Sequence, residues 1–453
     1  MEFTKIFQSQ RTFFNSHRTK DIAFRKQTLN KLKSILKDNE SSLYEAIYKD
    51  FRKSSFDTFL NELSMIYKEL DFFIKNLDKL SKPQRVKIPL TLQPAKSYIR
   101  YDPLGVTLII GAWNYPYQLT LVPMITAIAA GNTCIVKPSE LPENTMHLLA
   151  ELINTNFPPN YLHVVEGGIP ETTELLKLPY DKIFFTGSPK VGKIVYEAAA
   201  KNLVPVVLEL GGKSPAIVTE SADLEVTAKR LIWGKFLNAG QTCIAPDYLL
   251  VKESVKPKLL RLIKEKLDEI NYSNDAEYYT SIINKRNFDR IVSLVDANKI
   301  FYGGKTNEDT LYIEPTVLDH VNWDDAVMQE EIFGPVLPVI GFTNFDDALQ
   351  KIIDGEKPLA AYLFTNSNDQ KSKFLNLLSF GGGCINDTLM HITSEYLPFG
   401  GIGNSGIGHY HGEFGFLAFS HQKSIVDKAT WGEPDWKYPP YSDKKRKWLR
   451  RVL

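Results

Sequence analysis

Val106-Thr-Leu-Ile-Ile-Gly111 is a short, uninterrupted apolar run, which predicts a strand buried on both faces. The apolar residues of 119–130 follow it and predict a helix, and Thr133-Cys-Ile-Val-Lys137 predicts the next strand. Strands that alternate with helices in this way are typical of a parallel, doubly wound sheet. The stretch 106–137 therefore predicts an α/β fold.

The same alternation continues on the C-terminal side of this stretch. The expected elements are helices at 143–155, near Glu171, from Pro189, at 223–236 and at 256–270, and strands at 162–165, 183–186, 215–218 and 248–251. This order predicts one nucleotide-binding-like α/β domain that ends near Glu209 and a second α/β domain that follows it.

The N-terminal side of the stretch has a different pattern. Apolar residues between positions 22 and 80 recur at helical spacing, as at Leu63, Ile66 and Leu70, so this region is expected to be helical. Residues 83–103 carry four prolines and a partly alternating sequence. This pattern favours an extended hairpin outside the main core.

The composition limits the classes of function. A length of 453 residues suggests two or three domains, and the 43% hydrophobic and 24% charged fractions are those of an ordinary globular protein. The 54 basic residues almost balance the 53 acidic ones, so the basic surface that nucleic-acid binding requires is not indicated. We expect no nucleic-acid partner.

Cysteine usage and hydropathy predict the compartment. Cys134, Cys243 and Cys384 are too far apart for a disulfide framework or a Cys-x-x-Cys site, which favours a reducing, cytoplasmic environment. The longest apolar stretch, 119–131, contains Pro123 and is shorter than the ~20 residues that span a bilayer. The first 20 residues lack the apolar core of a secretory signal and are expected in the mature protein.

His409 and His411 are the two histidines that suggest a metal site. No further residue nearby completes a ligand set, so we expect a glycine-rich loop with solvated histidines instead. No metal is predicted.

The segment Phe185-Thr-Gly187-Ser-Pro-Lys-Val-Gly192-Lys-Ile194 joins an expected strand to an expected helix. Backbone N–H groups at such a helix start can hold a phosphate. The segment nearly matches a phosphate loop, but Ile194 replaces the hydroxyl residue that binds magnesium. It does not match G-x-G-x-x-G either, so its spacing leaves a dinucleotide site and a structural turn equally open.

Lys137-Pro-Ser-Glu140 lies just past an expected strand, where ligands collect in open α/β sheets. Its ammonium and carboxylate groups suit ribose hydroxyls, and the carboxylate would repel a 2′-phosphate. A helix start with Glu140 at the favourable end of the dipole explains the same residues without a ligand. Both interpretations remain open at this point.

Cys243 lies in Asn238-Ala-Gly-Gln-Thr-Cys243, directly after an expected helix. A lone cysteine is more often a small buried apolar residue than a nucleophile. Glu209 and Asn114, however, each stand just beyond an expected strand. A thiolate, a carboxylate base and an amide donor together make a set for acyl transfer.

At these residues the chain resembles the aldehyde dehydrogenase superfamily, and Trp113-Asn-Tyr-Pro116 with the short N-terminus resembles its class 3, fatty-aldehyde branch. The resemblance covers nearly the whole chain. Its motifs, in family order, are Trp113-Asn-Tyr-Pro116, Lys137-Pro-Ser-Glu140, Phe185-Thr-Gly-Ser188, Leu208-Glu-Leu-Gly-Gly212, Gly240-Gln-Thr-Cys243, Glu331-Ile-Phe-Gly-Pro335 and Pro398-Phe-Gly-Gly401.

The resemblance implies a catalytic role for three residues. Cys243 is the expected nucleophile, and the side chain of Asn114 with the N–H of Cys243 is expected to hold the oxyanion. After hydride leaves for the nicotinamide, Glu209 is expected to activate the water that hydrolyses the thioester. Relatives that pass the acyl group to coenzyme A lack this carboxylate, so a free acid is the expected product.

The resemblance also implies a cofactor site. Lys137 and Glu140 are expected at the adenine ribose, Ser188 at the pyrophosphate, Glu331 at the nicotinamide ribose, and Phe333 near the nicotinamide. The full expected cofactor-binding set is Lys137, Glu140, Gly187, Ser188, Gly192, Gly211, Glu331 and Phe333. Tyr115 is expected to line the substrate tunnel. NAD is the expected cofactor, with NADP as the second candidate.

The family fold implies three parts. We expect an NAD(P)-binding, Rossmann-like domain with N-terminal helices at 1–82 and 103–209, an α/β catalytic domain at 210–415, and a β extension with a basic tail at 83–102 and 416–453. The extension is expected to form a homodimer. The basic tail around Trp448 is expected to be solvated, with weak contact to an anionic membrane as the alternative.

The function expected from the resemblance is NAD(P)-dependent oxidation of medium- or long-chain aliphatic or aromatic aldehydes to carboxylic acids. One alternative is a cysteine esterase or thioesterase that needs no NAD, which would leave Lys137 and Glu140 unexplained. The other is a non-catalytic binding protein on the same fold. That alternative predicts the loss of a chemical residue, and Asn114, Glu209 and Cys243 are all present.

Overall fold

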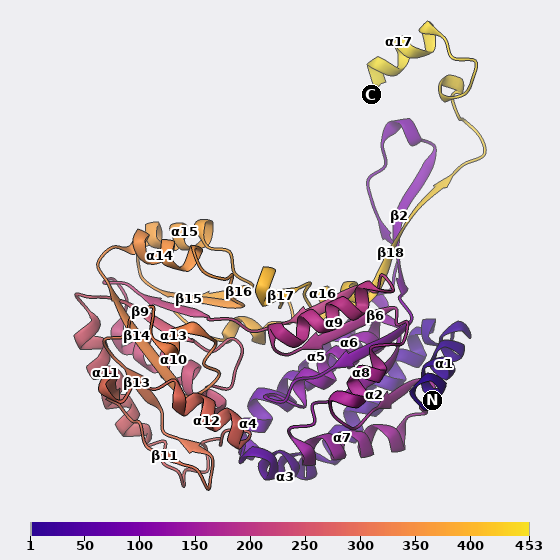
Figure 1. Ribbon diagram of the computed structural model, residues 1–453. Helices are drawn as coiled ribbons and strands as arrows, with labels where there is room; N and C mark the ends of the chain where they lie inside the picture. The colour runs from indigo at the N-terminus through magenta and orange to yellow at the C-terminus, as the bar shows by residue number, and fades with distance from the viewer. Residues whose placement is uncertain (1, 453) are drawn as a thin grey trace.

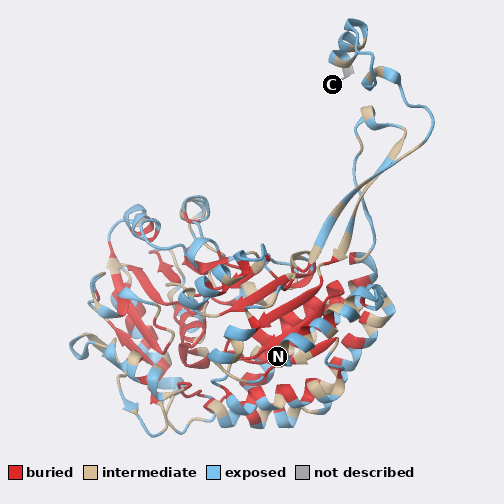
Figure 2. Ribbon diagram, turned by 45° about the vertical axis from the view of Figure 1, so that its right-hand side comes forward, coloured by how far each residue is buried: buried red, intermediate tan, exposed pale blue. Residues whose placement is uncertain are grey.

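Two twisted sheets of mostly parallel strands form the two halves of the protein, and a narrow β extension projects from one of them (Figure 1). The computed structural model describes residues 2–452. The α/β architecture predicted from residues 106–137 is confirmed. The inner strands are buried, and exposed residues concentrate on the outer helices and on the extension (Figure 2).

The first sheet has six strands in the order β17-β7-β6-β3-β4-β5, and β17 is its one antiparallel member. Every residue of β3, β4 and β6 is buried, because helices cover both faces of the sheet. The strands are β3 (Val106–Ile110), β4 (Thr133–Lys137), β5 (Leu162–Val164), β6 (Lys182–Thr186), β7 (Val206–Glu209) and β17 (Gly406–Ile407).

The helices of this half include the expected N-terminal group. They are α1 (Glu2–Asn15), α2 (Ile22–Asp38), α3 (Glu40–Phe51), α4 (Ser55–Thr58), α5 (Ser64–Leu80), α6 (Gln118–Ala130), α7 (Glu143–Asn156), α8 (Ile169–Leu175), α9 (Pro189–Ala200) and α16 (Gly412–Ala418). A π-helical turn, η2 (Phe59–Leu63), connects α4 to α5. Helix α6 is buried along its whole length, which explains its almost continuous apolar sequence.

The second sheet has seven strands in the order β10-β13-β14-β9-β8-β15-β16. They are β8 (Pro215–Val218), β9 (Tyr248–Lys252), β10 (Ile300–Tyr302), β13 (Thr316–Leu318), β14 (Val336–Phe342), β15 (Ala360–Phe364) and β16 (Gly382–Ile385). Its helices are α10 (Leu224–Phe236), α11 (Lys256–Ile270), α12 (Lys285–Ser293), α13 (Ala326–Gln329), α14 (Phe345–Ile353) and α15 (Asn368–Leu377). A two-stranded ribbon, β11 (Thr306–Asn307) with β12 (Tyr312–Ile313), lies beside it.

The proline-rich segment forms the expected hairpin, β1 (Gln84–Arg85) with β2 (Ala95–Pro103). The sequence did not indicate its third strand, β18 (Ser420–Lys428), which pairs antiparallel with β2 along the whole of both strands. Beyond β18 the chain ends in α17 (Asp443–Val452), at the far end of the extension (Figure 1).

Short 3₁₀ turns connect several elements: η1 (Arg18–Lys20), η3 (Leu90–Leu92), η4 (Leu237–Gly240), η5 (Ala297–Lys299), η6 (Met390–Thr393), η7 (Gly403–Ser405) and η8 (Asp435–Lys437). Within residues 2–452, no helix combines the length and the apolar character needed to cross a membrane.

Candidate active site

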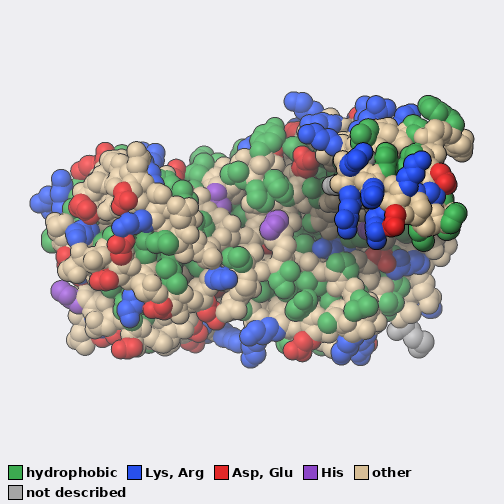
Figure 3. Space-filling view, turned by 90° about the horizontal axis from the view of Figure 1, so that it is seen from above, with side chains coloured by type: hydrophobic (Ala, Val, Ile, Leu, Met, Phe, Trp, Pro, Cys, Tyr) green, Lys and Arg blue, Asp and Glu red, His purple; other side chains and the backbone are tan. Residues whose placement is uncertain are grey.

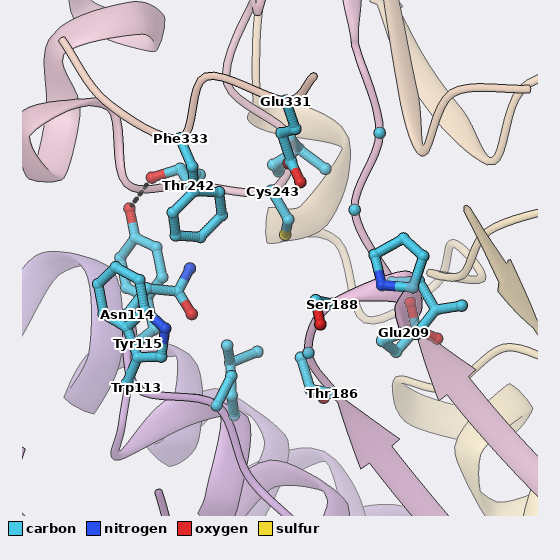
Figure 4. A pocket seen from close by; sticks show the side chains of 18 of the residues that line it. Trp113, Asn114, Tyr115, Thr186, Ser188, Glu209, Thr242, Cys243, Glu331 and Phe333 are labelled. Carbon is cyan, nitrogen blue, oxygen red and sulfur yellow. Dashed lines mark hydrogen bonds between the residues drawn. The ribbon is translucent and has the colours of Figure 1, made fainter. Parts of the chain in front are cut away.

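A cavity of about 1340 Å³ lies at the carboxyl ends of β3, β4, β6 and β7 and extends to the second half of the protein. Ligands of open α/β sheets bind at this edge. The cavity receives Asn114 and Glu209 from the first half and Cys243, Glu331 and Phe333 from the second. The structure therefore brings together residues that are far apart in the sequence (Figure 4).

Cys243 follows an unusual turn. Helix α10 ends at Phe236, and Asn238, Ala239 and Gly240 then have φ angles of 54°, 50° and 71°. A Cβ atom at Gly240 would lie 2.3 Å from the carbonyl oxygen of Gly334, so only glycine fits there. Successive left-handed residues store strain, and such strain is concentrated at functional sites. The turn directs Cys243 into the cavity.

Asn114 is fixed against the turn that carries Cys243. Its Nδ2 donates to the carbonyl oxygen of Gln241 at 3.0 Å, and Nδ2 of Asn238 donates to the carbonyl oxygen of Asn114 at 2.9 Å. An amide nitrogen carries two N–H groups, so one N–H of Asn114 remains for a ligand. Asn114 can therefore serve as a preorganised donor beside the thiol.

Glu209 is the last residue of β7 and is buried. Neither of its carboxylate oxygens has a hydrogen-bond partner among the described residues. Burial raises the pKa of Glu209 well above its usual range. Figure 4 shows Asn114 and Glu209 on opposite sides of Cys243. A carboxylate without partners beside a cavity is suited to take a proton from a water molecule.

The surroundings of Cys243 favour the neutral form of its thiol. Burial raises its pKa, and the nearby carboxylates of Glu331 and Glu209 raise it further. The thiolate is the nucleophile, so the thiol must lose its proton before or during attack. The arrangement of Cys243, Glu209 and Asn114 can form and hydrolyse an acyl-thioester.

One end of the cavity contains a buried lysine beside a half-exposed carboxylate. Nζ of Lys137 lies 4.0 Å from Oε2 of Glu140, and burial lowers the pKa of Lys137. Gly187 and Ser188 line the cavity at the start of α9, where Oγ of Ser188 caps the helix. Gly192 lies outside the cavity lining, and a Cβ atom there would lie 2.6 Å from Leu210. Its visible role is close packing of α9 on the sheet.

Glu331 and Phe333 lie at the other end of this region. A Cβ atom at Gly211 would lie 2.0 Å from Oε2 of Glu331, and Oε1 of Glu331 has no hydrogen-bond partner among the described residues. Burial, with a contribution from Asp247, raises the pKa of Glu331 to about 8. The ring of Phe333 packs edge-on against Trp113, 5.3 Å between centroids. An unpartnered oxygen in the cavity wall fits a ribose hydroxyl.

Some features of the site were missed in the sequence. Thr242 accepts or donates a 2.7 Å hydrogen bond with the hydroxyl of Tyr115, and Nζ of Lys213 contacts Asp247 and the carbonyl oxygen of Glu330. Lys213 directly follows the Leu208–Gly212 motif, and this position was the signal in the sequence that could have indicated it.

The prediction for His411 was wrong: it is buried rather than solvated, and burial lowers its pKa to about 3, whereas His409 is exposed.

A model of the aldehyde dehydrogenase family matches residues 1–425. The chain belongs to the aldehyde dehydrogenase family. It is 48% identical to the 4,4'-diaponeurosporen-aldehyde dehydrogenase of Staphylococcus aureus, over 97% of this chain and 96% of that protein. It is 45% identical to aldehyde dehydrogenase family 3 member A2 of Mus musculus, over 98% of this chain and 92% of that protein. The class 3 resemblance is thereby confirmed.

A solved structure described as the substrate-bound state of Staphylococcus aureus AldH superposes on this aldehyde dehydrogenase with a TM-score of 0.97. The two chains are 47% identical, and the match covers 99% of this chain and 98% of that one. The protein is an enzyme that oxidises aldehydes, as its family and relatives show, and homologues in this family use NAD(P).

Proposed function

We propose that this aldehyde dehydrogenase oxidises medium- and long-chain aliphatic and aromatic aldehydes to free carboxylic acids through a thioester on Cys243. The observation that carries the proposal is one cavity in which Asn114, Glu209 and Cys243 meet beside apolar walls. An apolar channel binds an apolar substrate tail by removing its surface from water. The apolar residues of the wall include Leu60, Met65, Trp113, Leu119, Trp233, Leu237, Leu389, Ile392 and Phe399.

The first chemical step belongs to Cys243. Its thiolate attacks the carbonyl carbon of the aldehyde, a C–S bond forms, and the carbonyl oxygen becomes an oxyanion. The free N–H of the Asn114 amide donates to this oxyanion in a largely water-excluded site. A nicotinamide held beside Cys243 would supply the acceptor for the hydride that the adduct must lose to become a thioester.

The second step belongs to Glu209. Its carboxylate takes a proton from a water molecule, the water oxygen attacks the thioester carbon, and the C–S bond breaks. The products are a carboxylic acid and the thiolate of Cys243. The unpartnered carboxylate oxygens of Glu209 support this role, because they leave room for the water in place of a fixed protein donor.

Residues of this chain fit a nicotinamide dinucleotide. Lys137 and Glu140 would hold the adenine ribose, and Ser188 would present its backbone N–H to the pyrophosphate. Gly187 would line the same region, while its own N–H donates to the carbonyl oxygen of Glu209 at 3.0 Å. Glu331 would accept from the nicotinamide ribose through its unpartnered Oε1, with Gly211 allowing the close approach. Because the carboxylate of Glu140 repels a 2′-phosphate, we propose NAD as the preferred cofactor.

A series of straight-chain and aromatic aldehydes, assayed with NAD and NADP in parallel, tests the proposed function. We expect kcat/KM to rise with chain length and to be higher with NAD. Glu140→Gln should raise kcat/KM with NADP by about 3- to 10-fold, since one exposed charge is worth roughly 1 kcal/mol. Absence of NADH formation with every apolar aldehyde would contradict the proposal, and equal use of both cofactors would contradict the role of Glu140.

The pH dependence follows from the raised pKa values of Cys243 and Glu209. Both groups act in their deprotonated forms, and burial favours the protonated form of each. We therefore expect kcat and kcat/KM to increase as the pH rises from about 6 to about 10, a range that lies above the pKa of ordinary carboxylates. Steady-state rates across this range, with the fold checked by circular dichroism, measure the profile. A flat profile would oppose both assignments.

We also propose the domain boundaries stated above, 1–82 with 103–209, 210–415, and 83–102 with 416–453. The two large sheets and the three-stranded sheet of the extension support them, because each set of residues contains one of these sheets apart from β17 and Pro103 of β2. Helix α16 (Gly412–Ala418) crosses the boundary at 415. Strand β17 adds to the first sheet from within 210–415, through the pairing of Gly406 with Glu209.

We propose that the extension forms a homodimer. Strand β18 is an edge strand, and large apolar side chains near it are exposed, among them Val426 and Trp431. The mass in solution should be about twice the 51.5 kDa of one chain. Val426→Asp should lower it toward one chain. A monomeric mass for the unaltered protein would end the proposal.

We propose a cytoplasmic protein whose tail binds anionic membranes weakly. Lys and Arg side chains gather over the end of the extension (Figure 3), where α17 carries Lys444, Lys445, Arg446, Lys447, Arg450 and Arg451 beside Trp448. Co-sedimentation with vesicles that contain anionic lipid should exceed that with neutral vesicles and fall with added salt. No difference between the two vesicle types would contradict membrane binding.

A further inference from the structure

Lys53 and Glu62 form a fully buried ion pair beside the cavity. Nζ of Lys53 lies 2.8 Å from Oε1 of Glu62, and both side chains are 0% exposed. Burying two charges costs desolvation free energy, and an apolar pair of the same volume is often as stable. Stability alone therefore does not account for the pair. The other contacts of the two side chains indicate what it does.

Glu62 fixes the start of α6. Its second carboxylate oxygen, Oε2, accepts from the backbone N–H of Tyr117 at 2.8 Å and of Gln118 at 3.2 Å. N–H groups at a helix start have no partner within the helix, and a carboxylate there is favoured by the helix dipole. Because Asn114 lies only three residues before Tyr117, Glu62 sets where the oxyanion segment, residues 113–117, leaves the cavity wall.

Glu62 lies in the π-helical turn η2, a kind of turn that often marks a functional site. Its neighbours Leu60 and Asn61, and Met65 after them, line the cavity. The same turn therefore supplies one wall of the substrate channel and the carboxylate that holds the oxyanion segment.

Lys53 fixes the other side of the oxyanion segment. Its Nζ lies 4.0 Å from the centre of the Tyr115 ring, an attraction that is stronger away from water. The hydroxyl of Tyr115 in turn lies 2.7 Å from Oγ1 of Thr242, the residue before Cys243. Contacts thus run without interruption from Glu62 through Lys53, Tyr115 and Thr242 to the nucleophile.

The backbone around Lys53 is itself held at the boundary between the two halves. Arg52 is in the left-handed region with φ of 57°, and the carbonyl oxygen of Phe51 accepts from N of Ser281 at 3.0 Å. The carbonyl oxygen of Ser281 accepts from Nε2 of Gln241 at 3.1 Å. Lys53 and the turn that carries Cys243 are therefore anchored to the same segment of the second half.

We propose that Lys53 and Glu62 are positioning residues that hold the oxyanion segment in register with Cys243. The pair orients the amide of Asn114 and the ring of Tyr115 and touches neither the substrate nor the cofactor. This inference rests on the proposed oxyanion role of Asn114. It predicts that loss of the pair slows the attack on the aldehyde and the hydride step while leaving cofactor affinity unchanged.

The variants Glu62→Gln and Lys53→Met test the proposal, together with the double variant K53M/E62Q, which removes both buried charges at once. We expect each to lower the rate of the NADH burst by about 10- to 100-fold, since small misplacement of a catalytic group has effects of this size. The dissociation constant of NAD should stay within about twofold. Lys53→Arg, which keeps the charge, should recover more of the rate than Lys53→Met.

The matched control is Lys256→Met. Lys256 forms a mostly buried ion pair with Asp319, 2.6 Å between Nζ and Oδ1, and neither residue lines the cavity. We expect this variant to lower Tm without changing the burst rate. If K53M/E62Q keeps its burst rate within about twofold, or if Lys53→Arg is no better than Lys53→Met, the pair is merely structural and the proposal is wrong. The double variant keeps the test available if the single variants do not fold.

Asn114→Ala, alone and combined with Glu62→Gln, separates this inference from the function on which it rests. If Glu62 acts through Asn114, the combined variant should be no slower in the burst than Asn114→Ala alone. A full burst rate in Asn114→Ala would refute the oxyanion role itself. A slow Asn114→Ala with an unaffected Glu62→Gln would refute only the positioning role.

Discussion

Cys243→Ala should abolish aldehyde oxidation, with kcat reduced by at least about 10⁴-fold. The reason is that the proposed nucleophile is lost, and no other described cysteine lines the cavity with Asn114 and Glu209. NADH formation with an apolar aldehyde is the measurement, and the dissociation constant of NAD should change little. An active Cys243→Ala would mean that the aldehyde is oxidised without a thioester on this residue.

Cys384→Ala is the control for this variant. Cys384 is half-buried, and its sulfur lies 3.7 Å from Nδ1 of His391, so geometry alone offers a second thiol with a base. Burial, however, lowers the pKa of His391 to about 4 and raises that of Cys384, so neither group is charged near neutral pH. Cys384→Ala should keep its activity. Loss of activity there and not in Cys243→Ala would reverse the assignment.

Glu209→Gln should separate the two halves of the reaction. Gln cannot deprotonate water, so we expect a burst of about one NADH for each active subunit, followed by a steady rate lowered by about 100-fold or more. Rapid-mixing absorbance of NADH gives both quantities. Since the Glu209 carboxylate is buried without a partner, the substitution should leave Tm unchanged or raise it.

Glu331→Gln provides the comparison for Glu209→Gln. Its carboxylate is also buried and has a raised pKa, but it is proposed to bind ribose rather than water. We expect weaker NAD binding and a slower burst in Glu331→Gln, with no accumulation of the acyl-enzyme. If Glu209→Gln gives the same kinetics as Glu331→Gln, deacylation does not depend on Glu209.

The order and type of most elements up to residue 270 could be predicted from the sequence because apolar periodicity reports burial directly. No individual element was predicted between residues 271 and 419. Strands such as Val106–Ile110 and Thr133–Lys137 are buried on both faces. Their uninterrupted apolar runs would expose apolar side chains to water anywhere except inside a sheet that is covered on both faces. Strand β18 escaped prediction because its alternation is weak and its partner, β2, lies more than 300 residues earlier. Pairing at that distance leaves no local signal.

The meeting of Cys243, Glu209 and Asn114 in one cavity was expected because their local motifs resemble those of a known family. The strand that ends at Glu209 was not itself among the predicted elements. His411 was misjudged because neighbouring glycines suggest exposure, whereas the structure buries its ring against Phe399 and Tyr410. Burial of a polar side chain depends on what packs over it, which no local pattern records.

The sequence by itself determined which chemical groups the proposed site contains, a thiol at Cys243, a carboxylate at Glu209 and an amide at Asn114, since residue identity is written along the chain. Only the tertiary structure decided how they are held. The Lys53–Glu62 pair holds the first half beside Asn114, and the left-handed turn before Cys243 shapes the second half. The Tyr115–Thr242 and Asn114–Gln241 hydrogen bonds join the two halves. The physical reason for these contacts is desolvation. A polar group that is buried loses its hydrogen bonds to water and must find a partner in the protein, and the fold alone sets which groups meet.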